Sequence, residues 1–408
     1  MLRLPSVLIA LLPLLLALVA RRCGCRAEFA QQGHFQARTR DIAAETHRVV
    51  QFLPVFWINL RASEDRRAFQ HQQLFNVRQT RVEAVEPTWE PYSRFVVHSP
   101  ASHDFASESP SGGRVWSREE VRGLPQWGGP GASGPAGALA RTRVAALLSH
   151  LRAVRAAYDS GEPLAMIMED AADFKHAPIW TKTLPEILSA APDGCEALLL
   201  HNAHAFVSEV FAPAGTLYVP AASQLSYGAM AYVLTRSAMH ALLTAAHGTD
   251  FESRDEASAL VYLPTKWYAP ADFVMDNAGD GAYVYMRPLL DRLPVPSTVD
   301  PSHPPLSSSY AIKGTAHVAL YFALRWELHR RAGGSNALTA EQAASLDARE
   351  VVRACVPPLS VVQLQPRSVA RVLRAVSREL GIDPPLEFRE DMLADHPHGD
   401  PRVNMDPA

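Results

Sequence analysis

Short apolar segments that alternate with helical patterns restrict this chain to a small set of folds. Leu164–Met168 (LAMIM) is apolar at every position, and Val55–Leu60 (VFWINL) is rich in β-branched and aromatic residues. Strands that lack a polar face are buried on both sides, as in parallel sheets that helices cover. The sequence therefore predicts an α/β fold built around a buried sheet.

Further strands and helices are predicted in alternation along the chain. Apolar residues recur at helical spacing from Val144 to Tyr158, and Gly161 and Pro163 end that pattern. A charged segment that can begin a helix also follows Val55–Leu60. Additional strands are predicted at Arg81–Glu86, Glu196–Leu200, Thr216–Pro220 and Ala229–Thr235. This alternation predicts an α/β sandwich with a mainly parallel sheet.

The chain divides into three predicted regions. Residues 1–30 are predicted to be a signal peptide or signal anchor, because Leu4–Ala20 is almost entirely apolar. Residues 50–312 are predicted to form the α/β domain, with a Gly/Pro-rich insertion at about 87–140 in which Gly128–Ala138 forms a loop or lid. Residues 313–408 are predicted to be a helical extension with a disordered tail.

Two local signals support helices in the C-terminal region. Thr339 is followed three residues later by Gln342, which predicts a capping box at a helix start. An apolar stripe from Val369 to Leu380 predicts a second helix, closed by Gly381. This region is interpreted as a packing extension without chemistry of its own.

The composition and the N-terminal segment of the chain restrict its expected partners and its expected cellular location. The net charge is −3, and no basic stripe with interleaved aromatic residues is present, so we expect no nucleic-acid partner. The apolar segment predicts the lumen of the endoplasmic reticulum or Golgi, or secretion, with membrane attachment through residues 4–20 as the alternative to cleavage. Organellar import stays open, because several arginines and no acid precede Glu28.

Three carboxylates follow the apolar strand Leu164–Met168. Glu169 and Asp170 come directly after it, and Asp173 follows two alanines. Ligands of α/β sheets bind at the carboxyl ends of the strands, and Mg²⁺ or Mn²⁺ often holds substrate phosphates through one or two acids there. The three acids are therefore predicted metal ligands. The alternative is a solvated turn or a helix N-cap whose acids meet the helix dipole.

Several separated segments together resemble the motifs of one known enzyme family. VFWINLRASEDRRAF, with Asn59 and Arg66, is similar to its first strand and the basic helix start that follows. RVEAVEP, which contains Glu86, resembles its second strand, and ALLSHLRAV resembles its Ser-His helix motif through Ser149 and His150. GEPLAMIMED resembles the approach to its Glu-Asp-Asp signature, and APADFVMD resembles a loop that contains an aspartate. The family that these segments resemble is glycosyltransferase family 25, which contains bacterial lipooligosaccharide and procollagen galactosyltransferases.

The resemblance spans roughly Val55 to Val299 and implies both a fold and an activity. It implies a GT-A type fold and inverting transfer of a hexose, most often galactose from UDP-galactose, to a hydroxyl of a glycan or protein acceptor, assisted by Mn²⁺ (or Mg²⁺). By the same resemblance, Asp272 is the candidate general base or acceptor contact, and Asp170 is the second candidate catalytic residue. The candidate substrate-binding residues are Asn59, Arg66, Glu86, Ser149 and His150.

Two alternatives stay open at this point. Ala171 occupies the position of the third acid of the family signature, so Asp173 can replace that acid only if the backbone turns after Asp170. On a continuing strand, residues 171 and 173 would lie about 6–7 Å apart. A catalytically weak family member that binds a sugar nucleotide or an acceptor is therefore the competing hypothesis. Asn59 and Arg66, in turn, either border the nucleotide or only cap and solvate the first helix.

Overall fold

The computed structural model describes most of the predicted α/β domain and the helical extension. The described residues are 42–86, 94–97, 114–117, 135–200, 217–221, 229–255, 260–263, 279–287, 289–293, 309–355 and 366–388. The predicted signal segment, Asp272 and the C-terminal tail lie outside these ranges. Among the helices that the structure describes, none has the length and apolarity needed to cross a membrane.

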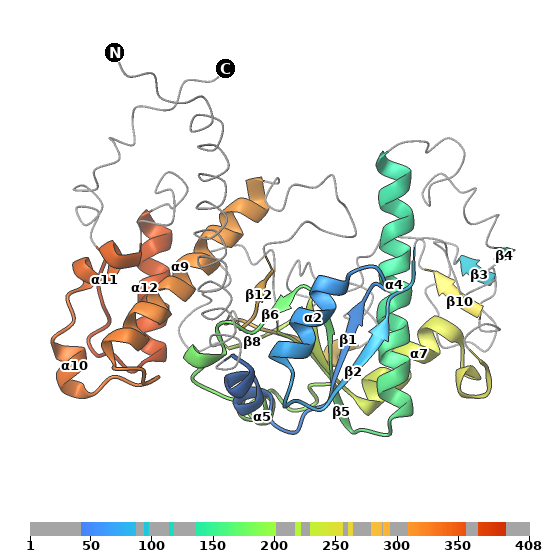
Figure 1. Cartoon of the computed structure of the whole chain (residues 1–408), viewed down its shortest axis with the longest axis horizontal. Coiled ribbons are helices and arrows are strands. Elements are labelled where there is room, and N and C mark those ends of the chain that lie inside the picture. The colour runs from blue at the N-terminus through green and yellow to red at the C-terminus, as the bar shows by residue number, and fades with distance from the viewer. Residues whose placement is uncertain are drawn as a thin grey trace, which may run out of the picture.

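A seven-stranded sheet in the order β2-β1-β5-β9-β7-β11-β8 forms the centre of the molecule (Figure 1). Its strands are β1 (Val55–Asn59), β2 (Gln79–Glu83), β5 (Leu164–Glu169), β7 (Ala197–Leu199), β8 (Tyr218–Pro220), β9 (Ala231–Thr235) and β11 (Ala282–Tyr285). Only β9 and β8 run opposite to the other strands of this sheet. The predicted α/β class with a mainly parallel sheet is confirmed.

Helices cover both faces of this sheet. One face carries α4 (Pro135–Asp159) and α7 (Arg236–His247). The other face carries a helix over residues 42–50, α2 (Glu64–Gln73) and α5 (Leu184–Ser189). Alternate residues of each strand enter the two cores: Phe56 packs toward α4, whereas Trp57 packs toward α2. All five residues of β1 are buried, as its apolar sequence predicts.

Helix α4 is much longer than the strands on which it packs. It contains 25 residues and contacts β1, β2 and β5. At 1.5 Å per residue it is about 37 Å long, roughly twice the length of a six-residue strand. Gly161, at a φ of 79°, stands just beyond its C-terminal end, as predicted. The N-terminal half of α4 therefore extends past the strands at their carboxyl edge (Figure 1).

The Gly/Pro-rich insertion contains more regular structure than its composition predicts. β3 (Arg94–Val97), β4 (Arg114–Ser117) and β10 (Leu260–Leu263) form a second, three-stranded sheet. The prediction of a loop over Gly128–Ala138 is wrong for residues 135–138, because α4 begins at Pro135. Proline is well tolerated in the first turn of a helix, and the alanines that follow favour helix.

The C-terminal extension packs as a separate helical cluster beside the sheet (Figure 1). Its helices are α9 (Ser309–Arg331), α10 (Ala340–Ala344), α11 (Ala348–Cys355) and α12 (Pro366–Glu379). The capping box of Thr339 and Gln342 is confirmed, as is the buried stripe of α12 that begins at Val369. Ile179, in the 3-10 helix Ala177–Ile179, joins this core and links the extension to the sheet domain.

The core of the extension yields a stability prediction. Leu373 of α12 is fully buried, so Leu373→Ala leaves a cavity and is expected to lower the free energy of unfolding by about 2–5 kcal/mol. Urea unfolding followed by tryptophan fluorescence measures this change. Arg371→Ala, at an exposed position of the same helix, is the control and should change stability by less than about 0.5 kcal/mol. Equal losses in the two variants would contradict the described packing.

Candidate functional site

The carboxyl ends of β1 and β5 lie side by side where the strand order of the sheet reverses. Ile58 pairs with Glu169, and the backbone N–H of Asp170 donates to the carbonyl of Ile58 at 3.0 Å. From β1 the chain passes to β2 on one side and then returns to β5 on the other. In open α/β sheets, such a reversal point is the usual place for a ligand.

The chain turns sharply after β5, in a segment that we call the acidic turn, Glu169–Asp173. Asp170 and Ala171 form the turn, and Ala172–Asp173 then forms β6, which pairs antiparallel with β12 (Asp291–Arg292). The backbone thus turns after Asp170, the condition under which Asp173 could approach the other acids.

Asp170 is the centre of a buried polar cluster. Its Oδ2 accepts a hydrogen bond from Asn59 Nδ2 at 2.7 Å, and its Oδ1 forms an ion pair with Arg66 Nη1 at 2.9 Å. The Asp170 side chain is only 9% exposed. Burial raises the pKa of this carboxyl above its ordinary value of 3.8, and the contacts with Asn59 and Arg66 oppose that rise. Three predicted residues from two separate segments, Asn59 and Arg66 from one and Asp170 from the other, are therefore brought together.

Asn59 and Arg66 do more than cap and solvate α2. Arg66 points to the acidic turn, and its side chain is 12% exposed. Asn59 donates to the carbonyl of Ser63 at the helix start and accepts from Arg81 Nε at 3.1 Å. The amide of Asn59 thus connects β1, β2, α2 and the acidic turn.

Two buried glutamines of α2 hold the backbone of the acidic turn. Gln70 Nε2 donates to the carbonyls of Asp170 at 3.0 Å and Ala172 at 2.8 Å. Gln73 Nε2 donates to the carbonyl of Ala172, and Gln73 Oε1 accepts from the N–H of Phe174. These glutamines were not predicted from the sequence. The available signal is their spacing, because residues 66, 70 and 73 lie on one face of a helix.

A second cluster connects the protein core to Glu169. His150 of α4 is buried, with its Nδ1 2.9 Å from the hydroxyl of Tyr232 and its Nε2 3.4 Å from Glu169 Oε1. An ionised carboxylate only accepts hydrogen bonds, so Nε2 is the donor in the contact with Glu169. In the tautomer that carries a proton on Nε2 alone, Nδ1 accepts from the Tyr232 hydroxyl. Burial raises the pKa of Tyr232 well above 10.0, which keeps its hydroxyl protonated. Glu169 is 39% exposed and so brings this chain of contacts to solvent.

Ser149 and Glu86, two of the predicted substrate-binding residues, differ in burial. The hydroxyl of Ser149 donates to the carbonyl of Ala145 at 2.6 Å and accepts from the N–H of Val85 at 2.8 Å. Ser149 is buried, so its observed contacts anchor the segment after β2 to α4. Glu86, next to Val85, is exposed.

The predicted metal ligands do not form one site in the described part of the chain. Glu169 contacts His150, Asp170 contacts Asn59 and Arg66, and Asp173 lies 3.9 Å from Lys175 Nζ. Within the described residues, no group of three or more His, Cys, Asp or Glu side chains is arranged to hold a metal ion. The pairing of β6 with β12 places Asp173 opposite Asp291, and Lys175 contacts both aspartates. The carboxylates present do not fit the predicted three-acid site.

Comparisons of the chain with protein-family models, with curated proteins and with solved structures find no match.

The glutamines of α2 give a stability prediction. Gln70→Leu removes both hydrogen bonds that Gln70 donates to the acidic turn and leaves the buried carbonyl of Asp170 with one donor fewer. We expect a loss of about 1–3 kcal/mol in the free energy of unfolding, measured by urea titration. Gln72→Leu, on the exposed side of the same helix, is the matched control and should leave stability nearly unchanged. A Gln70 variant as stable as the control would contradict the assigned role.

The raised pKa of Asp170 gives a pH prediction. Between its ordinary value of 3.8 and the raised value, the folded state binds more protons at this carboxyl than the unfolded state does. The stability that this raised pKa contributes is therefore fully present below about pH 4. It is lost as the pH rises through the raised value. Urea titrations of the wild type and Asp170→Asn across this range measure the effect. The free energy of unfolding of the wild type should fall relative to that of Asp170→Asn as the pH rises. A difference independent of pH would contradict the prediction.

Proposed function

We propose that this chain is a glycosyltransferase with a GT-A type domain that binds a sugar nucleotide. Its reaction would be inverting transfer of a hexose, with galactose as the first candidate, from a UDP-sugar to a hydroxyl of a glycan or protein in the secretory pathway. The observation that carries the proposal is the convergence of Asn59, Arg66 and Asp170 at the carboxyl ends of β1 and β5. This is the position at which such sheets bind nucleotides.

The chemistry of inverting transfer requires a base for the acceptor proton and positive charge near the departing diphosphate. Glu169 is a partly exposed carboxylate at this edge, and His150 orients it, so it can accept a proton from an acceptor hydroxyl. Asp272 remains the other candidate base, outside the described residues. Arg66 contacts Asp170, and Arg81 contacts Asn59. The two arginines therefore bring cationic groups to the carboxyl edge of the sheet.

The role of Mn²⁺ is part of this proposal, but no catalytic step is assigned to the ion. The carboxylates of the acidic turn have separate partners, and Ala171, where the family signature has an acid, is buried. These two observations favour a second candidate function. In that function the same edge binds a sugar nucleotide or an acceptor without transferring the sugar.

A donor assay tests the first function. The full-length chain is incubated with UDP-galactose, UDP-glucose and other UDP-sugars, with and without Mn²⁺, and release of UDP is measured. We expect turnover with one donor and a loss of at least about tenfold in kcat/KM for Arg66→Gln, which removes the cation paired with Asp170. Arg78→Gln is the control. Arg78 is exposed and directly precedes β2, so it lies at the amino ends of the strands and not at the carboxyl ends.

Binding measurements separate the two candidate functions. UDP that binds with a dependence on Arg66, without donor consumption, would support the second function and contradict the first. Absence of UDP binding by the folded wild-type chain would contradict both.

A further inference from the structure

Tyr232 lies at the inner end of the chain of contacts that reaches Glu169. It belongs to β9, where it pairs with Ile167 of β5, and it is fully buried. Two residues earlier in the chain, the carbonyl of Met230 accepts a hydrogen bond from the backbone N–H of Glu169 at 2.8 Å. The segment of β9 therefore holds the backbone of Glu169 directly, and it reaches the Glu169 side chain by way of His150.

The hydroxyl of Tyr232 keeps its proton, because burial and the charge of Glu169 raise its pKa well above 10.0. Its oxygen lies 2.9 Å from His150 Nδ1, and the two rings are stacked with their centroids 5.7 Å apart. Among the residues that the structure describes, Nδ1 of His150 is the one hydrogen-bond partner of this hydroxyl. The proton of Tyr232 therefore has one acceptor there, provided that Nδ1 carries no proton.

The three protonation states of the His150 ring differ in how they fit between Tyr232 and Glu169. With a proton on Nε2 alone, Nδ1 accepts from Tyr232 and Nε2 donates to the carboxylate. With a proton on Nδ1 alone, the lone pair of Nε2 would face the carboxylate at 3.4 Å. With both nitrogens protonated, the buried hydroxyl proton of Tyr232 would lose its acceptor, which is costly. Only the first state satisfies both contacts.

We propose that Tyr232 is a positioning residue that keeps His150 neutral, with the ring proton on Nε2 and directed at Glu169. A neutral N–H at 3.4 Å makes a long and therefore weak hydrogen bond, which orients the carboxylate. A cationic imidazolium in the same place would stabilise the ionised carboxylate more strongly and make it a poorer base. Tyr232 thus preserves the capacity of Glu169 to accept a proton.

This role of Tyr232 rests on the proposed sugar transfer, in which Glu169 is a candidate base. In that step the acceptor oxygen forms a bond to the anomeric carbon of the sugar, and the acceptor proton passes to Glu169. The bond from the anomeric carbon to the diphosphate breaks, and its electron pair leaves with the diphosphate oxygen. The competing explanation is that Tyr232 and His150 only fill the core between β9 and α4.

NMR of the full-length chain, with isotope-labelled nitrogen in its histidine rings, tests the assigned state at neutral pH. His150→Gln identifies the signals that belong to His150. In the wild type we expect the signal of an unprotonated Nδ1 and of a protonated Nε2. Tyr232→Phe keeps the ring but removes the hydroxyl donor. We therefore expect both signals to move toward the averaged positions of a ring that exchanges between states.

The donor assay measures the consequence for catalysis. We expect Tyr232→Phe to lower kcat about tenfold with little change in KM for the donor, because the hydroxyl acts on the base and not on donor binding. In a His150→Gln background, the same substitution should change kcat by less than about twofold. The glutamine amide can donate to Glu169 and has no tautomer for Tyr232 to select, so the two effects should not add.

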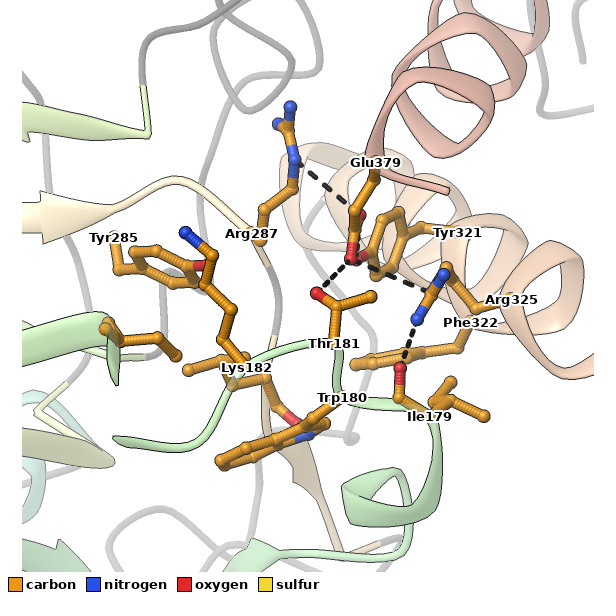
Figure 2. Close-up of a pocket in the computed structure, with 12 residues that line it drawn as sticks. Ile179, Trp180, Thr181, Lys182, Tyr285, Arg287, Tyr321, Phe322, Arg325 and Glu379 are labelled. Atoms are coloured by element: carbon orange, nitrogen blue, oxygen red, sulfur yellow. Dashed lines mark hydrogen bonds and ion pairs between the residues drawn. The ribbon is translucent and has the colours of Figure 1, made fainter. Parts of the chain in front are cut away.

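Tyr321→Phe is the matched control. Tyr321 of α9 is also buried, and its hydroxyl donates to a carboxylate, that of Glu379, at 2.7 Å. Figure 2 shows this tyrosine among the residues between the sheet domain and the helical extension. The control therefore removes a buried tyrosine hydroxyl away from the acidic turn. It should lower stability and leave both the His150 signals and kcat unchanged.

Three results would overturn the proposal. The first is a protonated Nδ1 of His150 in the wild type, and this spectrum decides the outcome if Tyr232→Phe does not fold. The second is a Tyr232→Phe variant with the His150 signals or the kcat of the wild type. The third is an equal loss of kcat in Tyr321→Phe. Absence of turnover in the wild type with every donor would instead overturn the sugar transfer and, with it, the base role of Glu169.

Discussion

The buried carboxylate of Asp170 is the contact on which the arrangement of the candidate site depends. It joins Asn59 at the end of β1 to Arg66 in the first turns of α2, and it does so directly after β5. Removing either partner would leave a buried charged or polar group without its hydrogen bond, which costs more than the bond itself contributes. The position of α2, the turn after β5 and the amide of Asn59 are therefore coupled.

Helix α2, which supplies Arg66, also holds the backbone of the acidic turn. Gln70 and Gln73 donate to main-chain carbonyls, so they act whatever side chain stands at residues 171 and 172. This explains how the turn keeps its form with Ala171 at the position where the resemblance predicts an acid. It also means that the geometry of the turn does not require a bound cation.

The sequence predicts most of the central sheet and part of the site, for identifiable reasons. β1 and β5 are recognisable because residues buried on both faces are apolar throughout, and Asn59 and Asp170 meet because adjacent parallel strands end at the same edge. The role of Gln70 was not predictable, because a polar residue on a helix resembles a solvent-exposed one until the acidic turn is placed against it. The contacts of Asp173 depend on the pairing of β6 with β12, which joins segments more than 100 residues apart. Local patterns contain no information about such a pairing.

Helix α4 has one further consequence for access to the site. Its first half extends past the sheet at the carboxyl edge, and its second half carries His150, which contacts Glu169 (Figure 1). The helix is continuous from the extended segment to His150. The segment that extends past the sheet and the histidine that contacts Glu169 thus belong to one helix. A ligand that tilts the extended part of α4 would therefore also shift the imidazole ring that contacts Glu169.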